Sequence, residues 1–114
     1  MKQENLTIEE IIKQENLTEA KQYPIKKYDK NNNEIYYEDS GGFWRKRKYD
    51  ENNNKIYWET SNGYWEKSKY DENSNEIYYE NSGGYWRKKD GENTLEFKDG
   101  KYFLNGKLMK KLKN

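Results

Sequence analysis

The sequence of 114 residues contains no cysteine and no histidine, and these two absences exclude several kinds of site. Without cysteine no disulfide forms, so the fold is not a disulfide-stapled secreted scaffold. Without histidine the chain lacks the usual ligand of zinc, copper and haem iron. It also lacks the base that serine and cysteine catalysis require. We therefore expect no metal and no cofactor.

Apolar residues are also scarce, at 31% of the chain. No apolar run approaches the length of a membrane-spanning helix, and the polar residues 1–7 lack the apolar stretch of a signal peptide. We therefore expect a cytoplasmic protein that does not enter a membrane. Aromatic residues, in contrast, reach 17%, with twelve Tyr and four Trp. Because aromatic side chains bury large areas, we predict a folded domain with a thin aromatic core.

A 21-residue repeat occupies the middle of the chain, over three copies between about residues 28 and 90. Each copy contains an Asn-rich cluster and a Ser/Gly cluster roughly 10 residues apart, which is the turn spacing of a β-meander. Residues with high strand propensity lie between these clusters. The repeated positions are Tyr-Asp at 28–29, 49–50 and 70–71, Ile-Tyr at 35–36, 56–57 and 77–78, and Gly-aromatic-Trp at 42–44, 63–65 and 84–86.

The pattern predicts a mostly β protein, an antiparallel meander of about eight or nine strands with a short N-terminal helix. We divide the chain into an N-terminal helical segment at 1–22, the three-repeat meander at 23–90, and C-terminal hairpins with a basic tail at 91–114. We expect these parts to form one compact unit. The tail strands are expected at 94–98, 101–104 and 107–112, separated by Asp-Gly and Asn-Gly turns.

The first helix is predicted from its N-terminal signals. Thr7 is a good N-cap and Glu10 stands at the capping-box position, ahead of an apolar stripe of isoleucines. We expect this helix to cover part of one sheet face. The sequence KQENLT at 2–7 recurs at 13–18, and for this second copy we predict only a short turn or a weak helix.

Strand alternation assigns side chains to two faces. If the Asn pair forms a two-residue turn, Tyr49 pairs with Ile56 and Arg47 pairs with Trp58. Trp44, Trp65 and Trp86 then form one ladder, and Tyr36, Tyr57 and Tyr78 form another. Ile35, Ile56 and Ile77 are the main aliphatic residues of the repeats, and we expect each to be a buried anchor.

Basic residues concentrate on the strands that carry Trp, whereas Glu concentrates on the strands that carry Ile. One interpretation is cross-strand ion pairing on a solvated sheet. The other is a basic, aromatic surface for a partner. Arg is favoured there because its guanidinium stacks on rings and donates paired hydrogen bonds to phosphate or carboxylate. The candidate partner-binding residues are Trp44, Arg45, Lys46, Arg47, Lys48, Trp65, Trp86, Arg87 and Lys88.

The Tyr-Asp-x-Asn-x-Asn-x-Ile unit that ends in Gly-aromatic-Trp resembles the YD (Rhs) repeat, over about 63 of the 114 residues. In that family many repeats spiral into a β-shell around a toxin or display a surface module, and three copies are too few to close a shell. A short, cysteine-free, repeat-built chain is also similar to small phage-encoded anti-defence proteins, among them anti-CRISPR inhibitors.

We expect a binding protein rather than an enzyme, because the chemically active side chains recur in every copy and do not form a unique constellation. The first hypothesis is an intracellular inhibitor that docks on a host protein or a protein–RNA complex such as a CRISPR effector. The second is direct binding of RNA or single-stranded DNA by the basic aromatic strands. The third is a surface or carbohydrate-binding repeat module. A homodimer through a sheet edge is a further expected interaction.

Overall fold

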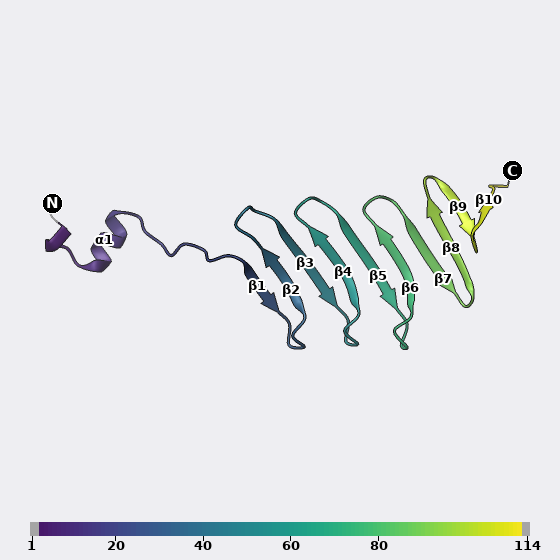
Figure 1. Ribbon diagram of the computed structural model, residues 1–114, viewed down its shortest axis with the longest axis horizontal. Coiled ribbons are helices and arrows are strands. Elements are labelled where there is room, and N and C mark those ends of the chain that lie inside the picture. Colours follow the sequence, from purple (N-terminus) through teal and green to yellow (C-terminus); the bar gives the residue numbers. More distant parts are fainter. Residues whose placement is uncertain (1–2, 113–114) are drawn as a thin grey trace.

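The computed structural model describes residues 3–112 and contains one ten-stranded antiparallel sheet, in which every strand is hydrogen-bonded to the next along the chain (Figure 1). The predicted meander is confirmed, with ten strands in place of eight or nine. The strands are β1 (Ile25–Tyr28), β2 (Glu34–Glu38), β3 (Trp44–Tyr49), β4 (Lys55–Thr60), β5 (Trp65–Tyr70), β6 (Glu76–Asn81), β7 (Trp86–Asp90), β8 (Asn93–Lys98), β9 (Lys101–Leu104) and β10 (Lys107–Met109).

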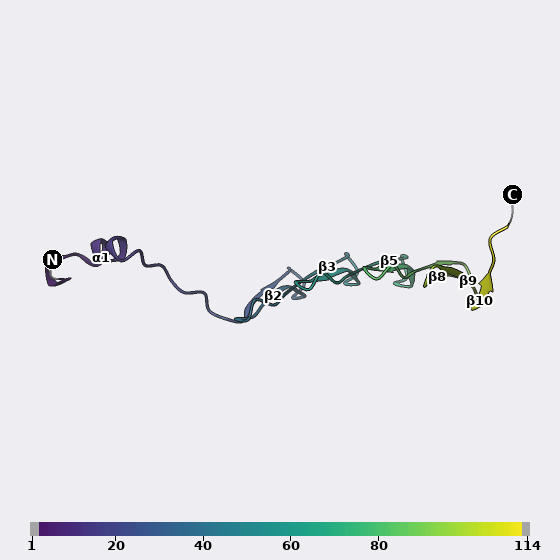
Figure 2. The ribbon, with the colours of Figure 1, turned by 90° about the horizontal axis from the view of Figure 1, so that it is seen from above.

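The sheet is a single layer, as its edge-on view in Figure 2 shows. Among the described residues no hydrophobic side chain is buried, and only Thr60, 7% exposed, falls in the buried class. The predicted aromatic core is therefore wrong, because no second layer covers either face. The expected burial of the repeat isoleucines is wrong for the same reason: Ile35 and Ile56 are half-buried and Ile77 is exposed.

Aspartate-centred turns join the two strands of each repeat hairpin. The Asp50 carboxylate accepts hydrogen bonds from the backbone N–H groups of Asn52 and Asn54, both at 2.9 Å. Asn53 between them has φ 64°, a left-handed conformation that asparagine tolerates. Asp29 and Asp71 hold their turns through the same pair of 2.9 Å bonds. The Asn-rich clusters of the sequence are therefore turns.

A β-bulge follows each of these turns and changes the predicted register. Arg47 pairs with Trp58, as the sequence predicts, but Tyr49 pairs with Lys55 instead of Ile56. The extra residue places Lys55 on the face that carries Arg47 and Trp58, where its ammonium lies 5.3 Å from the Trp58 ring centroid.

Side-chain hydrogen bonds also connect successive repeats at both ends of the strands. The Ser61 hydroxyl accepts from the Trp44 backbone N–H at 3.2 Å, and Ser82 does the same for Trp65. At the opposite end, the Asn54 side-chain amide donates to the Ser74 hydroxyl at 3.0 Å. These bonds link each repeat to its neighbour, which suits a fold whose stability is a sum of nearest-neighbour contacts.

The N-terminal helical segment lies beyond β1 and covers neither face, in contrast to the prediction (Figures 1 and 2). It contains a 3₁₀ turn (Gln3–Asn5) and helix α1 (Ile8–Gln14). The predicted capping box is present: Thr7 Oγ1 accepts from the Glu10 N–H, and Glu10 accepts from the Thr7 N–H. No helix of the described residues is long and apolar enough to cross a membrane.

The second KQENLT copy ends α1 instead of starting another helix. Asn16 has φ 54°, its N–H donates to the Lys13 carbonyl, and the Leu17 N–H donates to the Ile12 carbonyl at 2.9 Å. These two bonds and the left-handed residue form a Schellman motif. The same sequence therefore caps the beginning of the helix in one copy and its end in the other.

Candidate functional site

The register divides the side chains of the sheet between two solvent-facing surfaces. We call one the lysine–tryptophan face, because Trp44, Trp65 and Trp86 lie on it with the lysines of the same strands. The other is the arginine–tyrosine face, with Arg45, Arg47 and Arg87. Equivalent residues of successive repeats are two strands apart, a spacing of about 9.6 Å. The predicted tryptophan ladder therefore lies on a single face.

Each repeat tyrosine of the lysine–tryptophan face lies between two lysines of the neighbouring strands. Tyr57 pairs with Lys48 on one side and with Lys67 on the other. The Lys48 ammonium lies 5.8 Å from the Tyr57 ring centroid, within the range of a cation–π contact. The other two rows have the same composition: Lys27, Tyr36 and Lys46, and then Lys69, Tyr78 and Lys88.

Two shallow grooves follow these rows, one repeat apart. Their volumes are about 510 Å³ and about 490 Å³. Their linings combine isoleucine, tyrosine and lysine residues with one aspartate each, so each groove offers apolar surface, aromatic rings and two lysines. The first is lined by Ile35, Tyr36, Lys46, Lys48 and Ile56 among others, and the second by Ile56, Tyr57, Lys67, Lys69, Ile77 and Tyr78 among others.

Carboxylates alternate with the cations on the same face. Glu38, Glu59 and Glu80 pair with Trp44, Trp65 and Trp86. Glu80 lies 3.6 Å from the Lys67 ammonium and accepts a 3.0 Å hydrogen bond from the Tyr78 hydroxyl. Partial burial and this hydrogen bond raise the pKa of Tyr78, so the phenol stays protonated as a donor. The face is therefore of mixed charge.

Ion pairs occupy the arginines of the opposite face. The Arg45 guanidinium donates two hydrogen bonds to Glu34, at 2.9 and 3.2 Å, and lies 4.3 Å from the Tyr37 ring centroid. Arg47 lies 3.6 Å from the same Glu34 carboxylate. Arg87 repeats the arrangement with Glu76, at 2.6 and 2.9 Å. These arginines hold neighbouring strands together.

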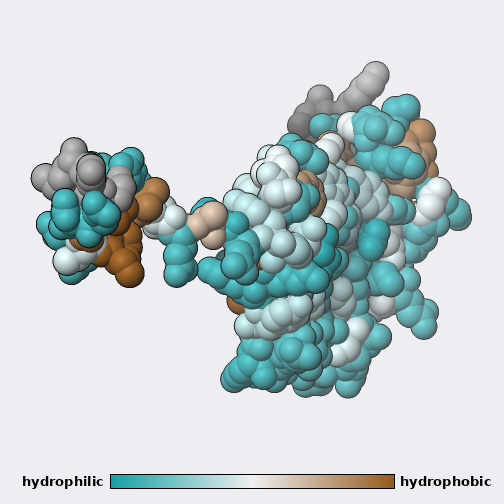
Figure 3. Space-filling model, turned by 60° about the vertical axis from the view of Figure 1, so that its left-hand side comes forward, coloured by the Kyte–Doolittle hydropathy of each residue, from teal (hydrophilic) through white to brown (hydrophobic). Residues whose placement is uncertain are grey.

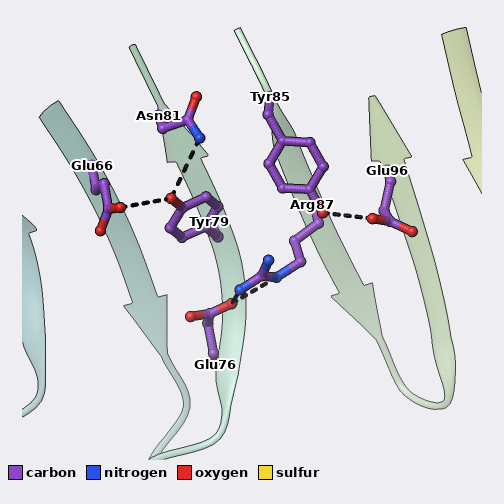
Figure 4. A network of polar contacts seen from close by, with 7 residues as sticks. All are labelled: Glu66, Glu76, Tyr79, Asn81, Tyr85, Arg87 and Glu96. Carbon is purple, nitrogen blue, oxygen red and sulfur yellow. Dashed lines mark hydrogen bonds and ion pairs between the residues drawn. The ribbon is translucent and has the colours of Figure 1, made fainter. Parts of the chain in front are cut away.

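A network of tyrosine hydroxyls and carboxylates surrounds Arg87 and extends across the four strands from β5 to β8 (Figure 4). The Tyr79 hydroxyl donates to Glu66 at 2.9 Å, and the Tyr85 hydroxyl donates to Glu96 at 2.5 Å. Glu66 also accepts from Tyr64, and this hydrogen bond is the main reason why the pKa of Tyr64 lies above its ordinary value. The network is part of what stabilises a sheet without a core.

The structure therefore separates the candidate residues into two groups. The lysine–tryptophan face carries Trp44, Trp65, Trp86, Lys46, Lys48 and Lys88. The arginine–tyrosine face carries Arg45, Arg47 and Arg87. Sequence reasoning omitted the flanked tyrosines and the lysines at 27, 67 and 69 from the site. The repeat carried a signal for Lys67, as a lysine two positions beyond each tryptophan in all three copies, whereas Lys27 and Lys69 do not occupy this position of the repeat.

No group of three or more acidic side chains that could hold a metal ion gathers within the part of the chain that the structure describes. Comparison of the chain with protein-family models, with curated proteins and with solved structures finds no match.

Proposed function

We propose that the chain is a non-enzymatic binding module that docks on another protein through its lysine–tryptophan face. The observation that carries this proposal is an uncovered face on which tryptophans, tyrosines, lysines and glutamates repeat in fixed rows. Tryptophan and tyrosine are the side chains that most often dominate the affinity of protein interfaces. The resemblance to YD repeats and to small phage inhibitors agrees with a role of this kind.

The charge pattern favours a protein over a nucleic acid. Glu38, Glu59 and Glu80 stand beside the three tryptophans, so a phosphate backbone laid along this ladder would meet a carboxylate in every repeat. The arginines, whose guanidinium groups would donate paired hydrogen bonds to phosphates, lie on the other face and form ion pairs with Glu34 and Glu76. The net charge of +1 adds no long-range attraction for nucleic acid. A protein surface with carboxylates, lysines and apolar side chains matches the face better.

The size of the face also fits a protein partner. Ten strands at about 4.8 Å and five residues at about 3.4 Å give a face of roughly 800 Å². One side of a standard protein–protein interface buries about 800 Å². The partner we propose is a host protein or a protein–RNA complex, and a phage-type inhibitor of a host defence nuclease is its specific case.

The test begins with recovery of a partner from host lysate, with and without nuclease treatment, followed by affinity measurements on the purified pair. Lys48→Glu/Lys69→Glu reverses two exposed cations of the proposed face. We expect this variant to bind at least about tenfold more weakly, the equivalent of about 1.4 kcal/mol.

The matched control is Lys26→Glu/Lys89→Glu, which makes the same charge change on exposed positions of the opposite face. It should bind like the parent, and both variants should keep the parent circular dichroism spectrum. Equal affinities for all three proteins would exclude this face as the interface. Recovery that depends on intact RNA would instead favour direct nucleic-acid binding.

A further inference from the structure

Helix α1 exposes an apolar stripe that the other described residues leave open. Ile8 is 78% exposed, and Ile12 and Leu17 are exposed as well. Figure 3 shows this apolar surface on the helical segment, apart from a sheet that is mostly hydrophilic or neutral in colour. A seven-residue helix has little stability of its own in water, even with a capping box at one end and a Schellman motif at the other. A surface that covers the isoleucines would stabilise it.

A second exposed apolar cluster lies at the far end of the sheet. It consists of Leu104 of β9, Leu108 and Met109 of β10, and Leu112 beyond them, and we call it the C-terminal apolar edge. Leu104 and Met109 lie on one side of the edge strand and Leu108 on the other, so the apolar surface runs around the edge. Leu108 is 62% exposed. β10 is the last strand of the sheet, so within residues 3–112 no further strand pairs with its outer side.

The two apolar surfaces carry opposite charges. Residues 3–17 contain four Glu and one Lys, whereas residues 101–112 contain four Lys and no acidic residue. Attraction between them would bring the helix onto the C-terminal apolar edge and set its orientation. Direct pairing of the two sheet edges is opposed, because both edge strands carry lysines: Lys26 and Lys27 in β1, and Lys107 in β10.

The isoleucine stripe cannot lie along this edge within its own chain. The Schellman motif extends the helical unit to Leu17, so seven residues connect it to Ile25 at the start of β1. Fully extended, these eight Cα–Cα steps place Leu17 at most about 29 Å from Ile25, and the helix rise of about 1.5 Å per residue lets Ile12 reach about 36 Å and Ile8 about 42 Å. The distance from β1 to β10 is nine strand spacings, about 43 Å, and β9 is about 38 Å away. Only the first residues of the helix could touch the edge of their own chain, so a helix that packs its whole stripe there comes from a second copy.

We propose that α1 of one copy packs its isoleucine stripe on the C-terminal apolar edge of another, in a head-to-tail contact. Such a contact is heterologous, so each copy keeps one free helix and one free edge, and association continues into open chains or closes into a ring. The contact is small beside a standard interface, so the association is weak and depends on concentration. It involves the far end of the lysine–tryptophan face only through Leu104 and Met109 and none of its repeat tryptophans or lysines, so it is argued independently of the proposed function.

Two variants of the full chain test the proposal by analytical ultracentrifugation over a concentration series. Ile8→Ser/Ile12→Ser removes the stripe, and Leu108→Ser/Met109→Ser removes the edge; all four positions are exposed, so the sheet should stay folded. We expect the parent to grow beyond a dimer with concentration, and each variant alone to remain monomeric. A 1:1 mixture of the two variants should form dimers and nothing larger, because it contains one intact helix and one intact edge.

A parent that stays monomeric throughout the series would overturn the proposal. So would association that persists in both variants alone, which would indicate pairing through another surface. A third arm uses charge: Glu9→Lys/Glu15→Lys and Lys110→Glu/Lys111→Glu should each weaken association, and the chain that carries all four changes should recover it.

Discussion

The charges of the ion pair between Glu34 and Arg45 are reversed at the equivalent positions of the next repeat. The positions 21 residues further on are Lys55 and Glu66, and the positions 21 residues beyond those are Glu76 and Arg87. The first and last copies therefore have acid and arginine, and the middle copy has lysine and acid. This alternation preserves opposite charges at one pair of positions on the arginine–tyrosine face. It predicts that a reversal of Arg45 alone is harmful and that a reversal of both members is tolerated.

The cost of Arg45→Glu follows from the contacts that it removes. Arg45 is 29% and Glu34 17% exposed, so solvent screens the pair in part. Loss of the two guanidinium hydrogen bonds costs about 1–2 kcal/mol at this exposure. Loss of the contact with Tyr37 adds about 0.5–1 kcal/mol, and two facing carboxylates add a similar repulsion. We expect a total of about 2–4 kcal/mol, although Arg45 is itself only partly buried.

The rescue variant is Arg45→Glu/Glu34→Lys, built in an Arg47→Ser background because Ser68 stands at that position in the middle repeat. We expect it to recover at least about half of the lost stability, a coupling energy of about 1–2 kcal/mol. Urea unfolding followed by circular dichroism measures both values, with Arg47→Ser alone as the reference. Two results would contradict this reasoning: Arg45→Glu leaves the free energy of unfolding at the value of its reference protein, or the addition of Glu34→Lys does not restore the lost stability. In either case the arginines are not strand-to-strand contacts and would again be candidates for partner binding.

Two further outcomes follow from the same contacts. Trp86 has ring contacts with Tyr78, Phe97 and Tyr102 at centroid distances of 6.0–6.5 Å. Trp44 has only the Lys46 ammonium, at 4.9 Å, among the described aromatic and cation contacts. Trp86→Ala should therefore lower the free energy of unfolding in urea by about 1–2 kcal/mol more than Trp44→Ala, and equal losses would contradict this reasoning. Hydrogen bonds from the turn backbone hold the pKa of each turn aspartate, Asp50 for example, below its ordinary value of 3.8, so their stabilisation is complete above about pH 5 and is lost as the pH falls through the lowered pKa. A thermal melt series from pH 7 to pH 2 should show this loss, and Asp50→Asn should make it smaller.

The repeat made the strands of this fold predictable, and its physical basis is local. Turn residues at fixed intervals and β-forming residues between them determine each hairpin without reference to the rest of the chain. The same holds for the Thr7–Glu10 capping box. The missing core was not predictable in this way, because burial depends on whether a second layer exists. Composition favoured an aromatic core. In the structure the aromatic side chains instead contact rings and lysine ammonium groups of neighbouring strands, on faces that are open to solvent.

The candidate site was predictable only in part, because one bulge per repeat alters which side chains meet. Strict alternation would place Glu34 on the lysine–tryptophan face, away from Arg45, and the arginines would then be free for a partner. The bulge shifts Glu34 to the arginine–tyrosine face, where both Arg45 and Arg47 contact it. The cations that alternation leaves in the open are the lysines, and they flank a tyrosine in every repeat. In this sheet without a core, ion pairs of arginine and glutamate stabilise one face. The other face exposes lysine, tyrosine and tryptophan side chains, which are the ones we propose to contact a partner.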